Sequence, residues 1–168
     1  VHIHNSDVFY FPRGLENFFD NLEGIIIQFS GLREIQKEDL KPFPKLRSLY
    51  LINGALKVIE ENLFEFNLNL ELIDLSVNSI SQIDPHVFDN FVDKLRFLNL
   101  NNNYCRFEIV AENKEQANEI IAKVQTGSCK PEENLTEYFE YTPTTTNTPD
   151  MTTQESSITN LCVSENKL

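Results

Sequence analysis

An apolar pattern recurs along this chain at an almost constant spacing. Each of its four complete copies places a leucine three and five positions before two further apolar residues: Leu22, Ile25 and Ile27; Leu46, Leu49 and Leu51; Leu70, Ile73 and Leu75; Leu95, Leu98 and Leu100. The first leucines of these copies are 24, 24 and 25 residues apart. An ordinary globular core requires only local matches, whereas stacked coils must present the same side chains at the same phase. The spacing therefore predicts a repeat solenoid.

Each copy of the pattern also predicts local structure. The alternation of apolar residues indicates a short strand with two side chains facing inward. Another residue suited to the interior follows five positions after each strand, at Leu32, Leu56, Ile80 and Cys105. The next segments are expected to close the back of each coil with Leu40 and Phe43, Phe64 and Phe66, and Phe88 and Phe91. Counting back 24 residues gives a truncated first copy with Val1, Ile3, Val8, Phe11 and Phe19. Because the chain begins inside the pattern, we interpret it as a fragment with about five repeats.

The pattern resembles the 24-residue extracellular form of the leucine-rich repeat family, L-x-x-L-x-L-x-x-N-x-L-x-x-I-x-x-x-x-F-x-x-F, from Val1 to about Lys130. The resemblance implies an α/β solenoid, a right-handed superhelix with a parallel concave sheet, similar to insect and vertebrate secreted or cell-surface proteins of this family. The asparagine of the motif is present at Asn78 and Asn103, but Ser6, Ser30 and Gly54 occupy the equivalent earlier positions. Serine can make only a shorter version of the hydrogen bond from the asparagine side chain to the turn, and glycine cannot make it at all. We therefore expect the first half of the solenoid to be packed more loosely.

A helical segment follows the repeats at residues 113–126. Asn113 and Gln116 form a helix-start signature, and Gly127 is a suitable stop. One apolar stripe is expected to lie on the last coil, made by Ala117, Ile120, Ile121 and Val124. The sequence thus predicts three regions: leucine-rich repeats at 1–104, a C-terminal cap with a capping helix at 105–130, and a disordered tail rich in Thr, Ser and Pro at 131–168.

Three cysteines bear on the cap and the tail. Cys105 and Cys129 bracket the predicted helix, and caps of the extracellular family commonly contain such a disulfide. A bridge across about 24 residues would contribute about 3 kcal/mol in the chain-entropy description; the alternative is that Cys105 is a buried thiol. Cys162 in the tail has no partner in this pairing and is a candidate for an intermolecular disulfide.

The tail and its border carry signs of secretion. Its Thr-Pro and Ser runs are typical of extended O-glycosylated stalks, with an unmodified disordered end as the alternative. The single N-x-S/T sequon, at Asn134, is a candidate N-glycosylation site. Together with the cysteines and the repeat subtype, these features favour an extracellular location, as a secreted protein or a cell-surface ectodomain.

Composition and motifs exclude several other functions. The net charge of −12, without a Lys or Arg cluster, argues against nucleic acid as a partner. No apolar run is long enough to span a membrane, and the first residues do not form a signal peptide. His2 and His4 share one strand face, but no third ligand accompanies them, so no metal site is expected. No phosphate-binding loop or nucleophile set is present, so we expect no catalytic residues, no cofactor and no enzyme activity.

Function is expected on the concave face, where residues between the buried leucines point outward. Several of these residues are apolar or aromatic although folding does not require it, which is typical of a protein interface. The candidate contacts are Ile26, Gln28, Phe29, Tyr50, Ile52, Asn53, Asp74, Val77, Phe97 and Asn99. The leading hypothesis is a recognition module that binds a protein ligand. The alternatives are a structural component of a disulfide-linked oligomer assembled through Cys162, and an intracellular adaptor with reduced cysteines.

Overall fold

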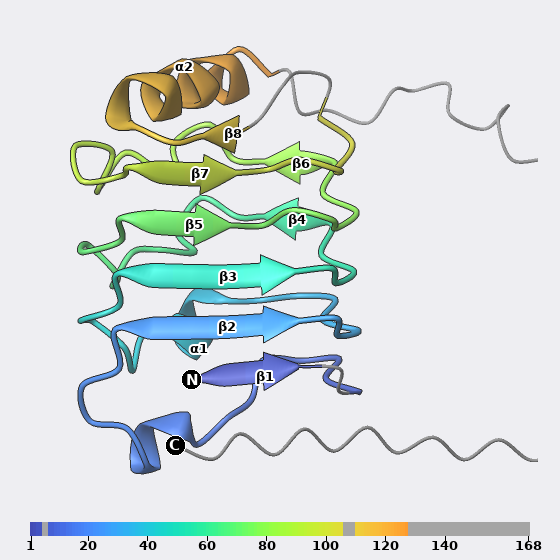
Figure 1. Cartoon of the computed structure of the whole chain (residues 1–168), viewed down its shortest axis with the longest axis vertical. Coiled ribbons are helices and arrows are strands. Elements are labelled where there is room, and N and C mark those ends of the chain that lie inside the picture. The colour runs from blue at the N-terminus through green and yellow to red at the C-terminus, as the bar shows by residue number, and fades with distance from the viewer. Residues whose placement is uncertain (5–6, 106–109, 128–168) are drawn as a thin grey trace, which may run out of the picture. The chain divides into compact units, whose positions relative to one another are not determined.

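The computed structural model describes residues 1–4, 7–105 and 110–127, and its main feature is a six-stranded sheet in the order β1-β2-β3-β5-β7-β8 (Figure 1). The strands of this sheet are β1 (His2–His4), β2 (Gly24–Gln28), β3 (Ser48–Ile52), β5 (Leu72–Asp74), β7 (Phe97–Asn99) and β8 (Val110–Ala111). The first five pair in parallel and β8 pairs antiparallel to β7. Figure 1 shows the strands stacked one above the other with α2 beyond β8. The predicted solenoid is confirmed.

The register of the parallel strands follows the sequence period. Ile26 lies beside Tyr50 and Tyr50 beside Asp74, each 24 residues further along the chain, whereas Leu72 pairs with Phe97 at 25 residues. The extra residue of the 25-residue repeat therefore lies outside the strands. Since one residue of slip would turn every buried side chain to the other face, the constant period fixes the register.

Short elements on the return side complete the coils. They are the 3₁₀ turn η1 (Leu15–Asn17), the helix α1 (Lys37–Leu40) and the two-residue strands β4 (Val58–Ile59) and β6 (Gln82–Ile83), which pair in parallel. The Asp39 carboxylate caps α1 by accepting from the Gln36 backbone N–H at 2.9 Å. These segments place the interior between the large sheet and the return side.

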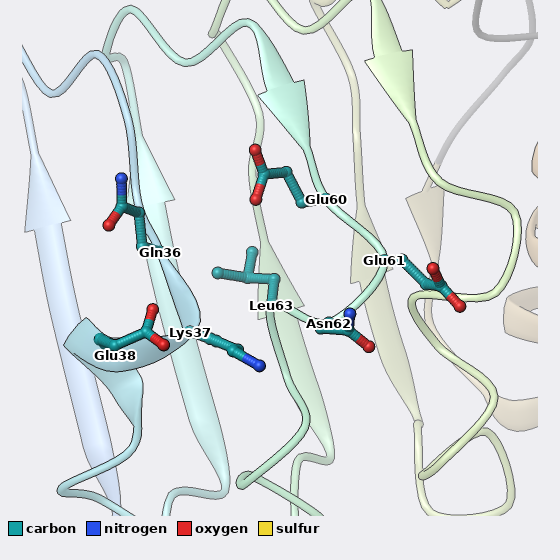
Figure 2. Close-up of a pocket in the computed structure, with 7 residues that line it drawn as sticks. All are labelled: Gln36, Lys37, Glu38, Glu60, Glu61, Asn62 and Leu63. Carbon is teal, nitrogen blue, oxygen red and sulfur yellow. The ribbon is translucent and has the colours of Figure 1, made fainter.

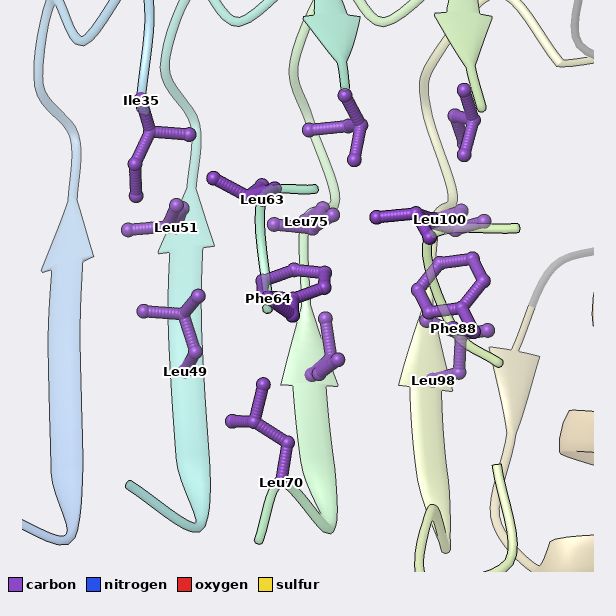
Figure 3. Packing of buried hydrophobic residues seen from close by; sticks show 14 of the residues in the cluster. Ile35, Leu49, Leu51, Leu63, Phe64, Leu70, Leu75, Phe88, Leu98 and Leu100 are labelled. Carbon is purple, nitrogen blue, oxygen red and sulfur yellow. The ribbon is translucent and has the colours of Figure 1, made fainter. Parts of the chain in front are cut away.

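The core is the hydrophobic wall that the repeat pattern predicts. Leu49, Leu75 and Leu98, one on each of three successive coils, are 0% exposed. Figure 3 shows leucines of neighbouring coils lying beside one another, with Phe64 and Phe88 close to them in the same cluster. Phe64 packs against Phe88 with ring centroids 6.3 Å apart and against the edge of Phe91 at 5.5 Å. The return side is therefore closed by aromatic rings.

One predicted core position is wrong. Phe66 is only half-buried, and Asn67 occupies the place that Phe43 and Phe91 hold 24 residues before and after it. Asn67 is 0% exposed, and its Nδ2 donates to the carbonyl oxygens of Leu40 at 3.0 Å and Phe43 at 2.8 Å. An amide thus replaces a ring at this point and links the coil to the preceding one.

The truncated first copy also departs from expectation at one position. Phe11 is buried and Ile3 and Val8 pack partly against the core, but Phe19 is 43% exposed. Phe19 differs from its equivalent Phe43 because only one described coil packs against this region.

Asparagine side chains connect successive turns where the motif has asparagine. The Asn78 Nδ2 donates to the carbonyls of Leu51 at 2.7 Å and Leu75 at 2.9 Å, and its Oδ1 accepts from the Leu56 N–H at 3.2 Å. Asn103 repeats this pattern one coil later. Ser30 offers only a 3.4 Å contact to the Leu32 N–H, and Ser6 lies outside the described residues. The hydrogen bonds therefore weaken toward the earlier coils, as the residue types predict.

Gly54 is required by the asparagine of the following coil. A Cβ atom built at Gly54 would lie 2.7 Å from the Asn78 Oδ1. Replacing Gly54 with alanine is expected to lower the free energy of unfolding by about 1–2 kcal/mol, because the amide must move away from the Leu56 N–H. Chemical denaturation measures the loss. The same change made in Asn78→Ala protein should cost much less, and equal costs in the two backgrounds would contradict the explanation.

A helical cap lies at the end of the large sheet where β8 is the last strand. The helix α2 (Lys114–Gln125) begins after Asn113, whose side chain accepts from the Gln116 N–H at 2.9 Å. Its buried residues are the four of the predicted stripe, Ala117, Ile120, Ile121 and Val124. Gly127 follows with φ of 79°. The helix contacts β7 and β8 and covers their apolar side chains, so the predicted capping helix is confirmed.

Candidate functional site

The side chains of the large sheet divide between two faces. Odd-numbered positions of β2, such as Ile25 and Ile27, are buried, and the residues between them point away from the core. We call this second face the open face, because in Figure 1 the described return segments lie on the other side of the sheet. It corresponds to the face predicted to be concave. Its described members on the strands and their continuations are His2, His4, Gly24, Ile26, Gln28, Ser48, Tyr50, Ile52, Leu72, Asp74, Ser76, Phe97, Asn99 and Asn101.

Aromatic and aliphatic groups gather in the middle of the open face. Tyr50 and Phe97 extend toward each other from β3 and β7, with ring centroids 6.5 Å apart. Ile26 lies beside Tyr50 on the neighbouring strand. Burial raises the pKa of the Tyr50 hydroxyl above its usual range, and the Asp74 carboxylate raises it further. Tyr50 is therefore a neutral group at pH 7, with a hydroxyl able to donate a hydrogen bond.

Asp74 is the least exposed of the predicted contact residues. It is 8% exposed, and its two carboxylate oxygens accept from the Ser76 N–H at 2.9 Å and the Asn99 Nδ2 at 3.0 Å. The Asn99 Oδ1 in turn accepts from the Asn101 N–H at 3.1 Å. Asp74 and Asn99 thus bond to each other and to the turn, and their polar atoms are largely used within the chain.

A column of residues in the turn after the strands has left-handed backbone geometry. Phe29, Asn53, Val77 and Asn102 have φ of 53°, 54°, 55° and 56°. We call these four residues the turn ridge. Phe29 and Val77 are 52% and 40% exposed, and the Phe29 ring lies 5.1 Å from that of His4. The first three residues of the ridge are among the predicted contacts, but their backbone geometry is not predicted; the asparagines at 53 and 102 are the one sequence signal for it.

Paired charges line the opposite edge of the open face, just before the strands. The residues Glu23, Arg47, Glu71 and Arg96 occupy equivalent positions in successive coils, and we call them the rim ladder. Arg47 Nε donates to Glu71 Oε1 at 2.9 Å, and Arg96 bonds to the other oxygen of the same carboxylate. In the adjacent row Lys45 bonds to Asn21, and Lys94 donates to Asn69 Oδ1 at 2.9 Å. The Lys and Arg side chains of this edge are therefore paired with Asn and Glu side chains of neighbouring coils.

The rim ladder predicts a pH dependence of stability. The Arg47 hydrogen bond, followed by Arg96, holds the pKa of Glu71 below its ordinary value near 4.5. A carboxyl whose pKa is lowered on folding stabilises the folded state above its unfolded-state pKa, and loses that effect as the pH falls through the folded pKa. Glu71→Gln should therefore lower the melting temperature slightly at pH 7 and not at all well below pH 4.5. Glu34→Gln, at an exposed carboxylate, is the control; a Glu71→Gln deficit that persists unchanged in acid would contradict the assignment.

The return side carries shallow grooves between coils. Figure 2 shows one lined by Gln36, Lys37, Glu38, Glu60, Glu61, Asn62 and Leu63. Lys37, one of the lining residues, pairs with Glu65 at 2.8 Å. Within residues 1–4, 7–105 and 110–127, no group of three or more His, Cys, Asp or Glu side chains could hold a metal ion. His2 on β1 instead contacts Gln28 through its Nε2 at 2.9 Å.

Several predicted features fall outside the part of the chain that the structure describes. Cys129, Cys162 and Asn134 lie there, as does the whole of 131–168. Cys105 is described and packs partly against the core. The Cys105–Cys129 disulfide, the intermolecular bridge through Cys162 and the glycan at Asn134 therefore stay predictions. The described helices include none long and apolar enough to cross a membrane.

The described residues form a solenoid of stacked coils with a parallel sheet and one open face. In agreement, the sequence model of the family described as leucine rich repeat matches residues 44–104. Among solved structures, the crystal structure of a TLR13–ssRNA13 complex matches with a TM-score of 0.47 and 23% identity, over 51% of this chain. The match spans only 12% of that other chain. A comparison with curated proteins gives no significant match.

Proposed function

We propose that this chain is a non-enzymatic, extracellular recognition module that binds a protein ligand through its open face. The observation that carries the proposal is the group of apolar and aromatic side chains on a face that core packing does not use. Ile26, Tyr50, Ile52 and Phe97 are only half-buried there, while the adjacent positions on the same strands are fully buried. Leucine-rich repeat solenoids offer extended binding surfaces of this kind. Exposed apolar groups with a polar rim are typical of protein interfaces.

The charge of the open face favours a protein ligand over a nucleic acid. No Lys or Arg belongs to its described residues, and the arginines at its edge are paired with Glu71. Phosphate binding depends on available cations, and the chain as a whole carries a charge of −12. The extracellular setting is supported by the resemblance of the repeats to the extracellular subtype and by the sequon and cysteines of the sequence.

A photo-crosslinking experiment tests the proposal while the ligand is still unidentified. A benzophenone amino acid placed at Ile52 on the open face, or at Gln82 on β6 of the return side, is exposed to extracellular fluid of the source organism. We expect a discrete adduct from position 52 and none from position 82, and mass spectrometry then identifies the captured protein. Adducts of equal yield from both positions would contradict the proposal.

The purified ligand then allows a quantitative check. Tyr50→Ala is expected to weaken its binding by more than about 1 kcal/mol, because a central aromatic group is truncated. The melting temperature should change little, because Tyr50 is half-buried on the open face and is not part of the core. Calorimetric titration of the two proteins measures the effect. Gln82→Ala on the return side is the matched control and should bind normally.

A further inference from the structure

The open face differs from the remainder of the chain in charge. The chain has 14 Lys and Arg and 26 Asp and Glu residues. Among the described residues of the open face and the turn ridge, Asp74 alone is an acid or base of this kind. Its carboxylate is buried and accepts from Ser76 and Asn99. A partner meeting this face therefore encounters almost no net charge, although the molecule is strongly acidic.

The fold accounts for the backbone geometry of the turn ridge but not for two of the residue types found there. A left-handed backbone costs L-residues roughly 1–2 kcal/mol, less for asparagine, and it is a genuine outlier for a β-branched residue. Asn53 and Asn102 suit this geometry, whereas Phe29 and Val77 do not. The same turn conformation recurs in each coil, so the two apolar residues are not required to produce it.

Hydrogen bonds between coils impose the conformation. The backbone N–H of Phe29 donates to the Ile52 carbonyl at 3.1 Å, that of Asn53 to Ser76 at 3.1 Å, and that of Val77 to Asn101 at 2.9 Å. These bonds form whether the residue is asparagine or not. Burial does not offset the strain either, because Phe29 and Val77 are 52% and 40% exposed. Strained residues that the fold does not need are characteristic of functional sites.

We propose that Phe29 and Val77 anchor the ligand of the open face, and that this ligand presents an uncharged apolar polypeptide segment to them. The inference rests on the proposed function and specifies the partner chemistry of the same face. The two anchors stand two coils apart, which corresponds to about 10 Å at the usual strand spacing. Asn53 between them supplies amide groups that can bond to a polypeptide backbone. The absence of an unpaired charge on the described residues of this face disfavours a basic segment.

A phage-displayed library of random linear 12-residue peptides is the probe. Panning uses the full chain as bait and discards phage that also bind the Tyr50→Asp/Ile52→Asp variant. We expect the enriched peptides to be rich in aromatic and aliphatic residues and to contain no more Lys and Arg than the input library. Enrichment of basic peptides, or no enrichment over the variant, would overturn the inference.

Substitution of the anchors provides the decisive measurement. Phe29→Asn and Val77→Asn should each weaken binding of a selected peptide about tenfold or more, while the melting temperature stays the same or rises because backbone strain is relieved. Val58→Asn is the matched control, since Val58 is 42% exposed on β4 of the return side; it should bind normally and gain no stability. Peptide affinity that survives both ridge substitutions overturns the inference, and so does a loss of affinity accompanied by a lower melting temperature.

The design separates this inference from the proposed function. If peptides remain after phage that bind Tyr50→Asp/Ile52→Asp are discarded, and the ridge variants bind those peptides normally, the open face is a binding surface and the assignment of Phe29 and Val77 as anchors is wrong. If every enriched phage also binds the Tyr50→Asp/Ile52→Asp variant and is discarded, the binding site lies elsewhere and both proposals fail.

Discussion

Phe64→Ala is expected to lower the free energy of unfolding by about 3–5 kcal/mol, the largest effect of any single truncation proposed for this chain. Phe64 is 1% exposed, and its ring contacts those of Phe88 and Phe91. Removing it eliminates apolar burial and leaves a cavity bordered by two further rings, which cannot collapse freely because both are packed within the return segment of the next coil. Urea denaturation followed by circular dichroism measures the loss.

The neighbouring phenylalanine gives a matched control for this prediction. Phe66 stands two residues away, is half-buried, and has the Lys41 ammonium 5.1 Å from its ring centroid. Phe66→Ala removes the same side chain but only a partly exposed contact, so it should cost about 1 kcal/mol. A loss at Phe66 as large as that at Phe64 would mean that the return segment packs in the other register.

Asn67→Asp is the second substitution with a large expected effect. The Asn67 Nδ2 donates to the carbonyl oxygens of Leu40 and Phe43 inside the core, and within the described residues its Oδ1 has no hydrogen-bond partner. A carboxylate at this position would replace the donor with a charged acceptor facing two carbonyls. We expect a loss of about 3–5 kcal/mol at pH 7, the usual cost of a buried charge without a partner.

The effect of Asn67→Asp should depend on pH in a defined direction. Burial without a cation raises the pKa of a carboxyl above its unfolded value, so folding favours the protonated form. The penalty is then smallest near the unfolded-state pKa of about 3.9 and grows as the pH rises. Denaturation at pH 4 and pH 7, each against the parent protein, measures this difference.

An exposed asparagine two positions later provides the control. Asn69 lies at the surface, where its Oδ1 accepts from Lys94 at 2.9 Å. Asn69→Asp retains an acceptor for that ammonium and should leave stability nearly unchanged. If Asn67→Asp is equally harmless at pH 7, Asn67 is not held in the buried position that the structure gives it.

The sequence predicts most of the fold because the period acts on every coil at once. Leu49 and Leu75 need no tertiary information to be assigned to the interior, since their spacing already fixes their phase. The capping helix is predictable for a similar reason: Asn113 and the apolar stripe are local signals. Features that repeat, or that lie within a few neighbouring residues, are thus accessible from the chain alone.

Other features depend on contacts that the sequence does not encode locally. Asn67 is flanked by Phe66 and Leu68, so a pattern of apolar residues gives no reason to bury the amide between them. The two-residue strand β8 pairs antiparallel to β7, and the repeat pattern of parallel strands does not predict this pairing. Both arise from how coils meet rather than from a propensity of their own residues.

The candidate site shows the same division. Tyr50, Ile52 and Phe97 lie on the open face where the alternation predicts them. Asp74 lies beside Tyr50 on the same face, but its carboxylate bonds to Ser76 and Asn99, and these contacts come from tertiary proximity. The left-handed geometry of Phe29 and Val77 likewise results from hydrogen bonds to the next coil. The face that each residue occupies is therefore predictable from the sequence, whereas its hydrogen bonds, burial and backbone geometry are not.

The alternating signs of Glu23, Arg47, Glu71 and Arg96 restrict how this solenoid can change in length. Deleting the coil that contains Glu71 would place Arg47 against Arg96 and, one row away, Lys45 against Lys94. Deleting two adjacent coils would preserve every opposite-sign neighbour. A change by an even number of coils therefore keeps every pair of this ladder, whereas a change by an odd number places like charges side by side; the charge pattern repeats over a pair of coils, twice the period of the leucines.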